Sequence, residues 1–172
     1  MNTKKILIVD DDIDIVNVIR TILENEGYQV ISAHNKIDGI KLAKEQLPDL
    51  AILDVMMTTP YEGFELAEEI INDAAFKNMP VLMQTSIDVF TTTKESVREM
   101  AREFRLDPKY KELQVILMKD IVSGKAGIDY RTEEGKTVWL PVDGFLKKPV
   151  DSNKLLPQIT ELMEQKVDFH NN

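Results

Sequence analysis

The sequence contains no cysteine, so neither disulfide bonds nor thiolate metal sites can form. It also lacks any apolar stretch long enough to cross a bilayer, and its first apolar run, Ile6 to Val9, is too short for a signal peptide and is followed at once by acidic residues. These absences predict a cytoplasmic protein that does not bind membranes.

Basic residues are in the minority, with 21 Lys or Arg against 30 Asp or Glu, a net charge of −9. An acidic surface repels phosphates, which argues against nucleic acid as a direct partner. Residues 87–142 hold 10 basic and 10 acidic residues, so the whole excess of negative charge lies outside them. This change in composition predicts a neutral segment inserted into an acidic domain.

The chain of 172 residues suits one domain with a sizeable core, or one domain carrying a large insertion. Neither Gly nor Pro is abundant enough to indicate disorder, at 7 residues each. We expect a domain over residues 1–166, interrupted by an insertion at about 88–141, and a tail over residues 167–172.

Apolar β-branched runs alternate with segments of helical periodicity. The strands are predicted at Lys5 to Val9 and in "YQVISA", "DLAILDV", "MPVLMQTS" and "DGFLKKP". Helices are predicted around Ile15 to Leu23 with Gly27 as the stop, in "KIDGIKLAKEQ", around Phe64 to Ile70, and in "SNKLLPQITELMEQ" with Asp151 or Ser152 as the cap. This alternation predicts an α/β fold: a doubly wound, open, parallel five-stranded sheet flanked by helices.

The insertion is predicted to hold helices and a hairpin. Thr92 with Glu95 suggests a capping box ahead of a helix with Val97, Met100, Ala101 and Phe104 on one face. Asp107-Pro108 suggests a second helix leading into "KYKELQVILMKDIV", and "IDYRTEEGKTVWL" suggests a hairpin turning near Glu134-Gly135. Residues 113–118 also resemble a buried strand that would compete with residues 81–85 for fourth place in the sheet. We favour the earlier run, which ends in a hydroxyl residue, Thr85.

Polar side chains follow several of the predicted strands. Asp10, Asp11 and Asp12 follow the first strand, Asp54 ends the third, Thr85 and Ser86 end the fourth, and Lys147 and Lys148 end the last. Ligands of such sheets bind beyond the carboxyl ends of the strands. Oxygen ligands from two strands suit Mg²⁺, and a lysine with a hydroxyl beside it suits a phosphoryl group.

This set of motifs resembles the receiver domain of two-component response regulators, which has a flavodoxin-like fold. The resemblance rests on "ILIVDDD", "PDLAILDVMM", "EGFELAEEI", "PVLMQTS" and "DGFLKKP", in that order, and covers residues 4–87 and 143–165. The chain departs from the family in a slightly longer loop, "MMTTPYEGFEL", and in the long segment between Thr85 and Lys148.

The resemblance implies a role for each matching residue. Asp54 would accept the phosphoryl group, and Asp10, Asp11, Asp54 and the backbone carbonyl of Met56 would hold Mg²⁺. Lys148 would bind the phosphoryl oxygens, Thr85 would bond them through its hydroxyl, Ser86 would leave room for the donor, and Phe145 would occupy the aromatic switch position. Asp12 is assigned no contact with the metal.

The resemblance also implies partners. The donor would be a phosphohistidine on a sensor histidine kinase or phosphotransfer protein, since His34 and His170 match no motif and are expected at the surface. The output would be an unknown downstream protein, because too few residues follow the closing helix for an output domain. The insertion is expected to modify or enlarge the surface that responds to phosphorylation, including as a homodimer contact.

Two other functions compete with a phosphorylatable receiver. One is a protein-binding module that keeps the fold but works without phosphorylation. The other is a Mg²⁺-dependent phosphatase acting through an aspartyl phosphate, although Met56 stands where such an enzyme would need a second acid, two residues after Asp54. We therefore expect no enzymatic activity beyond the chain's own phosphorylation and dephosphorylation.

Overall fold

The first half of the chain builds a parallel sheet, and its last strand arrives much later. The computed structural model describes residues 2–94 and 96–168. The five strands lie in the order β2-β1-β3-β4-β9, and every neighbouring pair is parallel. Their bounds are β1 Lys5–Val9, β2 Gln29–Ala33, β3 Leu50–Asp54, β4 Val81–Thr85 and β9 Gly144–Lys147. The predicted five-stranded parallel sheet is therefore confirmed.

Helices cover both faces of this sheet, as predicted. α1 (Ile13–Asn25) and α5 (Ser152–Asp168) share one apolar core with the sheet, in which Ile19 and Ile159 contact the face that carries Ile8. α2 (Lys36–Gln46), α3 (Glu62–Asn72) and the short 3₁₀ helix η1 (Ala74–Phe76) pack on the other face. α5 is capped by the Asp151 carboxylate, which accepts a hydrogen bond from the backbone N–H of Lys154 at 2.9 Å. The helix extends to Asp168, into the predicted tail.

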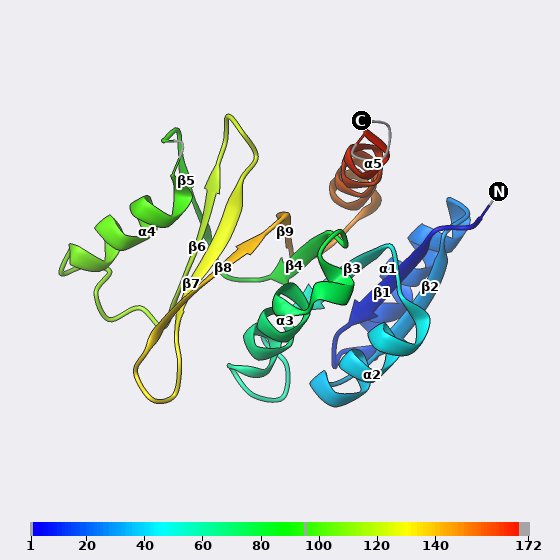
Figure 1. Cartoon of the computed structure of the whole chain (residues 1–172), viewed down its shortest axis with the longest axis horizontal. Coiled ribbons are helices and arrows are strands. Elements are labelled where there is room, and N and C mark those ends of the chain that lie inside the picture. Colours follow the sequence, from blue (N-terminus) through cyan, green and yellow to red (C-terminus); the bar gives the residue numbers. More distant parts are fainter. Residues whose placement is uncertain (1, 95, 169–172) are drawn as a thin grey trace.

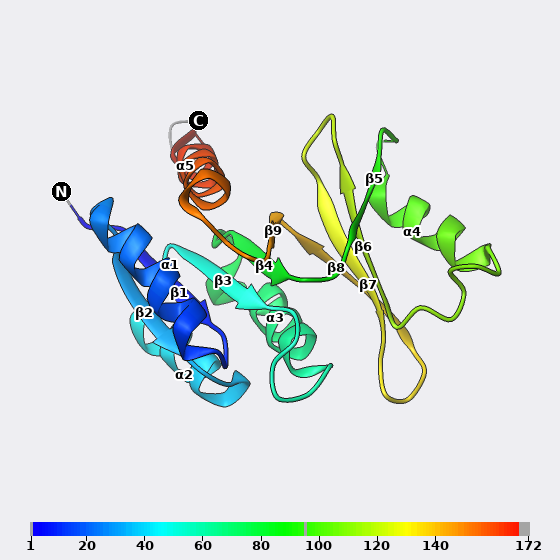
Figure 2. The ribbon, with the colours of Figure 1, turned by 180° about the vertical axis from the view of Figure 1, so that it is seen from behind.

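The segment expected to be an insertion forms a second sheet. Its strands lie in the order β5-β6-β7-β8, with β5 parallel to β6 and the other pairs antiparallel. The bounds are β5 Val89–Thr92, β6 Val115–Asp120, β7 Ala126–Arg131 and β8 Thr137–Val142. Figures 1 and 2 show this sheet beside β4, β9 and α3, at the end of the molecule away from β2.

The second sheet shares a hydrophobic core with the first. Leu117, Ile128 and Leu140 belong to the same buried cluster as the side chains of α3 and of the central strands. Tyr130 on β7 stacks on Phe64 of α3, with ring centroids 4.8 Å apart, and its hydroxyl donates to the Glu68 carboxylate at 2.6 Å. Burial and the Glu68 carboxylate both raise the pKa of Tyr130. The second sheet is thus packed against the first as part of one core.

Helix α4 (Val97–Leu106) covers the opposite face of the second sheet (Figure 1). Its buried Val97 and Ala101 contact Ile116 and Met118 of β6. At its far end the Arg105 guanidinium forms an ion pair with Asp129 of β7, with the Nη2 to Oδ1 distance at 2.7 Å and side chains only 11% and 5% exposed. Three aromatic side chains, Phe90, Phe104 and Tyr110, pack around this end.

The structure corrects part of the prediction for the insertion. The predicted helix through "KYKELQVILMKDIV" is wrong: Asp107 begins only a turn, and the apolar run is strand β6. β6 does not compete for fourth place in the main sheet, which residues 81–85 take as preferred. The hairpin is confirmed, with its turn at Gly135, where φ is +84°.

The start of α4 was also predicted wrongly. Thr92 lies in β5, a strand that the sequence analysis did not predict, so it cannot cap the helix. Ser96 is the cap, and its hydroxyl accepts from the N–H of Glu99 at 3.2 Å. Glu95, the other half of the predicted capping box, lies outside the described residues.

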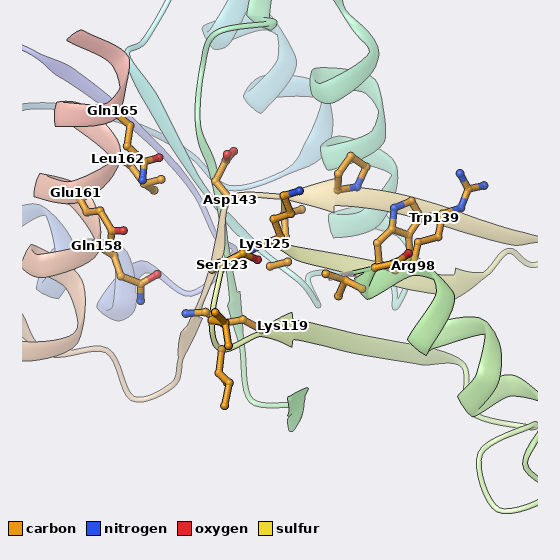
Figure 3. Close-up of a pocket in the computed structure, with 18 residues that line it drawn as sticks. Arg98, Lys119, Ser123, Lys125, Trp139, Asp143, Gln158, Glu161, Leu162 and Gln165 are labelled. Atoms are coloured by element: carbon orange, nitrogen blue, oxygen red, sulfur yellow. The ribbon is translucent and has the colours of Figure 1, made fainter. Parts of the chain in front are cut away.

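A cleft of about 630 Å³ separates α5 from one end of the second sheet (Figure 3). Lys119 and Lys125 line it from the second sheet, and Glu161 and Gln165 line it from α5. Across the described ranges 2–94 and 96–168, the helices are all too short or too polar to span a bilayer.

Candidate functional site

Three carboxylates meet at the carboxyl edge of the central sheet. Asp10 follows β1, Asp11 is next to it, and Asp54 ends β3. One carboxylate oxygen from each lies within 4.8 Å of the others. Asp10 and Asp54 are buried, whereas Asp11 is exposed. The structure therefore brings together the three acids that the sequence analysis assigned to a Mg²⁺ site.

Asp10 is held by hydrogen bonds on both carboxylate oxygens. Its Oδ1 accepts from the backbone N–H of Asp12 at 2.9 Å, and its Oδ2 accepts from the Gln84 side-chain amide at 3.2 Å. The His34 ring nitrogen Nδ1 lies 3.0 Å from the Asp10 backbone oxygen. His34 is exposed, as predicted, and His170 lies outside the described residues.

Lys148 brings a positive charge to this cluster. Its Nζ lies 2.9 Å from Asp54 Oδ1 and 3.6 Å from Asp10 Oδ2. Its backbone N–H donates to the Thr85 carbonyl at 2.8 Å, which ties the end of β9 to the end of β4. Burial alone would lower the pKa of Lys148, but the bond to Asp54 and the charges of both aspartates outweigh it and raise the pKa.

The Asp54 carboxyl is the most perturbed acid of the site. Burial raises its pKa to about 6, and the Asp10 charge adds to this rise. The hydrogen bond from Lys148 and the backbone N–H of Met56 oppose it. A single lysine therefore leaves this cluster short of positive charge, and the site is suited to a cation.

A glycine lets helix α3 begin next to Asp54. A Cβ at Gly63 would lie 2.1 Å from the Asp54 carbonyl oxygen and 2.3 Å from that of Val55. Real Cβ atoms do not approach oxygen so closely, so this packing requires glycine. Glu62 is tied to the start of α2 because its carboxylate accepts from the Lys36 N–H at 2.9 Å.

The third aspartate has a structural role. Asp12 is the N-cap of α1, and its carboxylate accepts from the N–H groups of Asp14 and Ile15 at 2.9 and 3.3 Å. An aspartate directly before a helical periodicity is the usual signal for such a cap. The run of three aspartates thus combines two candidate metal ligands with one helix cap.

The residues assigned to switching lie around the ends of β4 and β9. Thr85 is buried, and its hydroxyl accepts from the Ile87 N–H at 2.8 Å. Among the described residues, no hydrogen bond joins this hydroxyl to the side chain of Asp54 or Lys148. Ser86 is exposed, and its carbonyl accepts from Lys147 Nζ at 3.2 Å. Phe145 is 8% exposed and belongs to the core shared with the second sheet. Their roles in switching stay predictions.

Gln84 is a member of this site that the sequence analysis missed. It is fully buried on β4, where its Cα is the register partner of Asp54. Its signal in the sequence was a single amide within the apolar run "PVLMQTS". Burying an unpaired polar group is costly, so an amide at a buried strand position indicates a specific partner.

The donor set fits a divalent cation such as Mg²⁺. Asp10, Asp11 and Asp54 supply hard oxygen ligands, and the exposed Asp11 leaves the cluster open to water, which Mg²⁺ keeps in part. The buried Gln84 Oε1 has no hydrogen-bond partner in the part of the chain that the structure describes. The Met56 backbone carbonyl stays a predicted ligand, while its N–H donates to the Asp54 carboxyl.

Without a cation, the free energy of unfolding should depend on Asp54. Its pKa is raised from 3.8 to about 6 in the folded state, so folding takes up a proton between these values. The contribution of Asp54 to the free energy of unfolding is therefore fully favourable below pH 3.8. It is lost as the pH rises through about 6, a total change of about 3 kcal/mol. Urea titrations in EDTA measure the free energy of unfolding. As the pH rises from about 4 to 8, this free energy should fall in the wild type relative to Asp54→Asn. Parallel pH profiles would contradict the shift.

Comparison with known proteins agrees with the geometry of the site. Residues 6–114 match the model of the response regulator receiver domain. The match ends before Lys148, which the structure brings back to Asp54 through β9. The chain is 30% identical over 120 residues to protein PilH of Pseudomonas aeruginosa. This alignment covers 70% of the chain and 98% of PilH.

Longer regulators match over part of their length only. The alkaline phosphatase synthesis transcriptional regulatory protein PhoP of Bacillus subtilis is 38% identical over 85 residues, or 49% of this chain and 34% of PhoP. The chain thus spans about a third of that regulator.

Solved structures show the same fold. A CheY-like response regulator receiver domain protein from Methanospirillum hungatei aligns with a TM-score of 0.59 at 25% identity, over 97% of this chain and 98% of that one. The signal receiver domain of a histidine kinase from Syntrophus aciditrophicus aligns with a TM-score of 0.60 at 20% identity, over 95% and 92%. From its sequence match, its fold and its acidic site together, this chain belongs to the response regulator receiver domain family.

Proposed function

We propose that the chain is a phosphorylatable receiver that accepts a phosphoryl group on Asp54 and signals to another protein. The observation that supports this most is the 2.9 Å contact between Asp54 Oδ1 and Lys148 Nζ, next to the carboxylates of Asp10 and Asp11. A structural ion pair would not require two further acids in the same cluster. The site resembles one built to bring an anion to a carboxylate.

The reaction is the attack of an Asp54 carboxylate oxygen on the phosphorus of a donor phosphohistidine. The new P–O bond forms while the P–N bond breaks, and the imidazole of a sensor histidine kinase or phosphotransfer protein leaves. With a pKa of about 6, Asp54 is mostly ionised at neutral pH and needs no base. Lys148 binds the phosphoryl oxygens, and a bound Mg²⁺ supplies further neutralisation of negative charge.

Incubation with acetyl phosphate and Mg²⁺, followed by intact-mass measurement, tests this function. The expected result is a gain of one phosphoryl group that persists for minutes and is absent in EDTA. Rapid turnover of the donor without a stable adduct would favour the phosphatase instead. No gain under any of these conditions would favour the module that works without phosphorylation.

We expect the conformational change that follows phosphorylation to extend to the second sheet. The Thr85 hydroxyl now accepts from the Ile87 N–H at 2.8 Å, and β5 begins two residues later at Val89. A hydroxyl drawn toward a phosphoryl group would release Ile87 and shift the start of β5. Phe145, in the core shared with that sheet, would repack in response.

The sole tryptophan, Trp139 on β8, reports on this coupling. We expect phosphorylation to change the emission of Trp139 in wild type, and Thr85→Ala to accept the phosphoryl group with a much smaller change. Thr91→Ala, on the exposed part of β5, serves as the matched control and should respond as wild type does. An equal response in Thr85→Ala and wild type would rule out Thr85 as the link.

A further inference from the structure

Gln84 lies in an environment that does not favour an amide. Every residue of β4 is buried, and Gln84 is 0% exposed. Its strand neighbours in the register are Asp54 on β3 and Leu146 on β9. Burying an amide with incomplete hydrogen bonding costs about 1–3 kcal/mol. An apolar side chain would suit the strand better, so the amide requires another reason.

The two ends of the amide differ in their contacts. Nε2 donates to Asp10 Oδ2 at 3.2 Å, the oxygen that also lies 3.6 Å from Lys148 Nζ. Oε1 is buried and has no donor within reach among the described residues. The other Asp10 oxygen is bonded to the Asp12 N–H, so Gln84 completes the support of this carboxylate.

We propose that Gln84 is a positioning residue of the cation site. Its N–H group fixes the Asp10 carboxylate without adding charge, so the carboxylate keeps its full attraction for a cation. Its unpartnered Oε1 is an acceptor for a water molecule of a hydrated cation, and Mg²⁺ commonly keeps several such waters. This inference rests on the proposed function, because it concerns the same Mg²⁺ site.

The inference predicts a specific loss of metal binding when Gln84 is replaced. Gln84→Leu removes the support of Asp10, and loss of such outer contacts typically weakens metal binding by about 10–100-fold. The same change removes a buried acceptor without a partner, but it also takes a donor from the buried Asp10 carboxylate, so the loss of affinity, and not the stability in EDTA, is the decisive measurement. A side chain important only for packing would lower stability and leave the Mg²⁺ affinity unchanged.

Isothermal titration of the unphosphorylated chain with Mg²⁺ measures the affinity, and urea unfolding in EDTA measures the stability. We expect the Kd of Gln84→Leu to rise by about tenfold or more. Gln84→Met, which is also unbranched, gives the same comparison if the Leu variant does not fold. A folded variant with a Kd within about twofold of wild type would overturn the inference.

Two control variants distinguish the role of Gln84 from a general effect of mutation and from failure of the Mg²⁺ site itself. Gln158 donates through Nε2 to the Phe145 carbonyl at 3.0 Å, away from the acids, so Gln158→Leu should keep the wild-type Kd. An equal loss in Gln158→Leu would show a general effect and overturn the role of Gln84. Asp10→Ala should abolish Mg²⁺ binding. If it binds as wild type does, the Mg²⁺ site itself fails, whatever Gln84 does.

Discussion

Replacing Asp54 by Asn should abolish phosphoryl incorporation from acetyl phosphate while leaving the fold intact. The amide has nearly the shape of the carboxylate but is a far weaker nucleophile, so no aspartyl phosphate can form at this position. Asp54 is 2% exposed and its Oδ1 contacts Lys148, which makes it the acid best placed beside the lysine. Intact-mass measurement should show no adduct in the variant under conditions that modify the wild type.

Asp11→Asn is the matched control for this experiment. Asp11 belongs to the same acidic cluster but is exposed, and in the described part of the chain Lys148 pairs with Asp10 and Asp54 instead. We expect it to accept the phosphoryl group more slowly and with a higher Mg²⁺ requirement, but not to lose the reaction. An adduct of full yield on Asp54→Asn would place the acceptor elsewhere in the chain.

Asp129→Ala should strongly destabilise the second sheet. It leaves the Arg105 guanidinium, which is only 11% exposed, without its counter-charge. Breaking a buried ion pair from one side typically costs about 3–5 kcal/mol because the remaining charge is uncompensated. Urea unfolding should show this loss as a lower midpoint with a similar slope.

The double variant Arg105→Met with Asp129→Leu separates charge from packing. It removes both charges together, so most of the loss should be recovered. A matched surface pair, Lys94 with Glu103, has side chains 63% and 58% exposed, and Glu103→Ala should cost less than about 1 kcal/mol. If Asp129→Ala costs no more than Glu103→Ala, the ion pair does not stabilise the second sheet.

The main sheet and its acidic site could be predicted from the sequence because both follow from local patterns. A strand buried on both faces is a continuous apolar run; Asp10 and Asp54 each follow such a run directly, and Lys148 lies two residues after Leu146. Parallel topology then places the ends of the strands at one edge. The role of Gln84 could not be predicted from local patterns, because its hydrogen bond to Asp10 joins residues 74 positions apart.

The second sheet was harder to predict because short apolar runs fit a helix or a strand equally well. Val115 to Met118 became strand β6 because the β7–β8 hairpin offered backbone partners along its whole length, from Val115 opposite Tyr130 to Lys119 opposite Ala126. β5 is only four residues long and pairs in parallel with β6, so its own sequence carries almost no signal. Tertiary pairing decided both elements.

The core that Leu117, Ile128 and Leu140 share with the central strands bears on how such a chain could be shortened. Excising residues 88–141 would expose Phe145 and the stacked face of Phe64 to solvent. The exposed core would form an apolar patch that favours aggregation. A trimmed version would need a replacement cover, such as an amphipathic helix, to remain monodisperse. The second sheet therefore serves as part of the hydrophobic core of the whole domain.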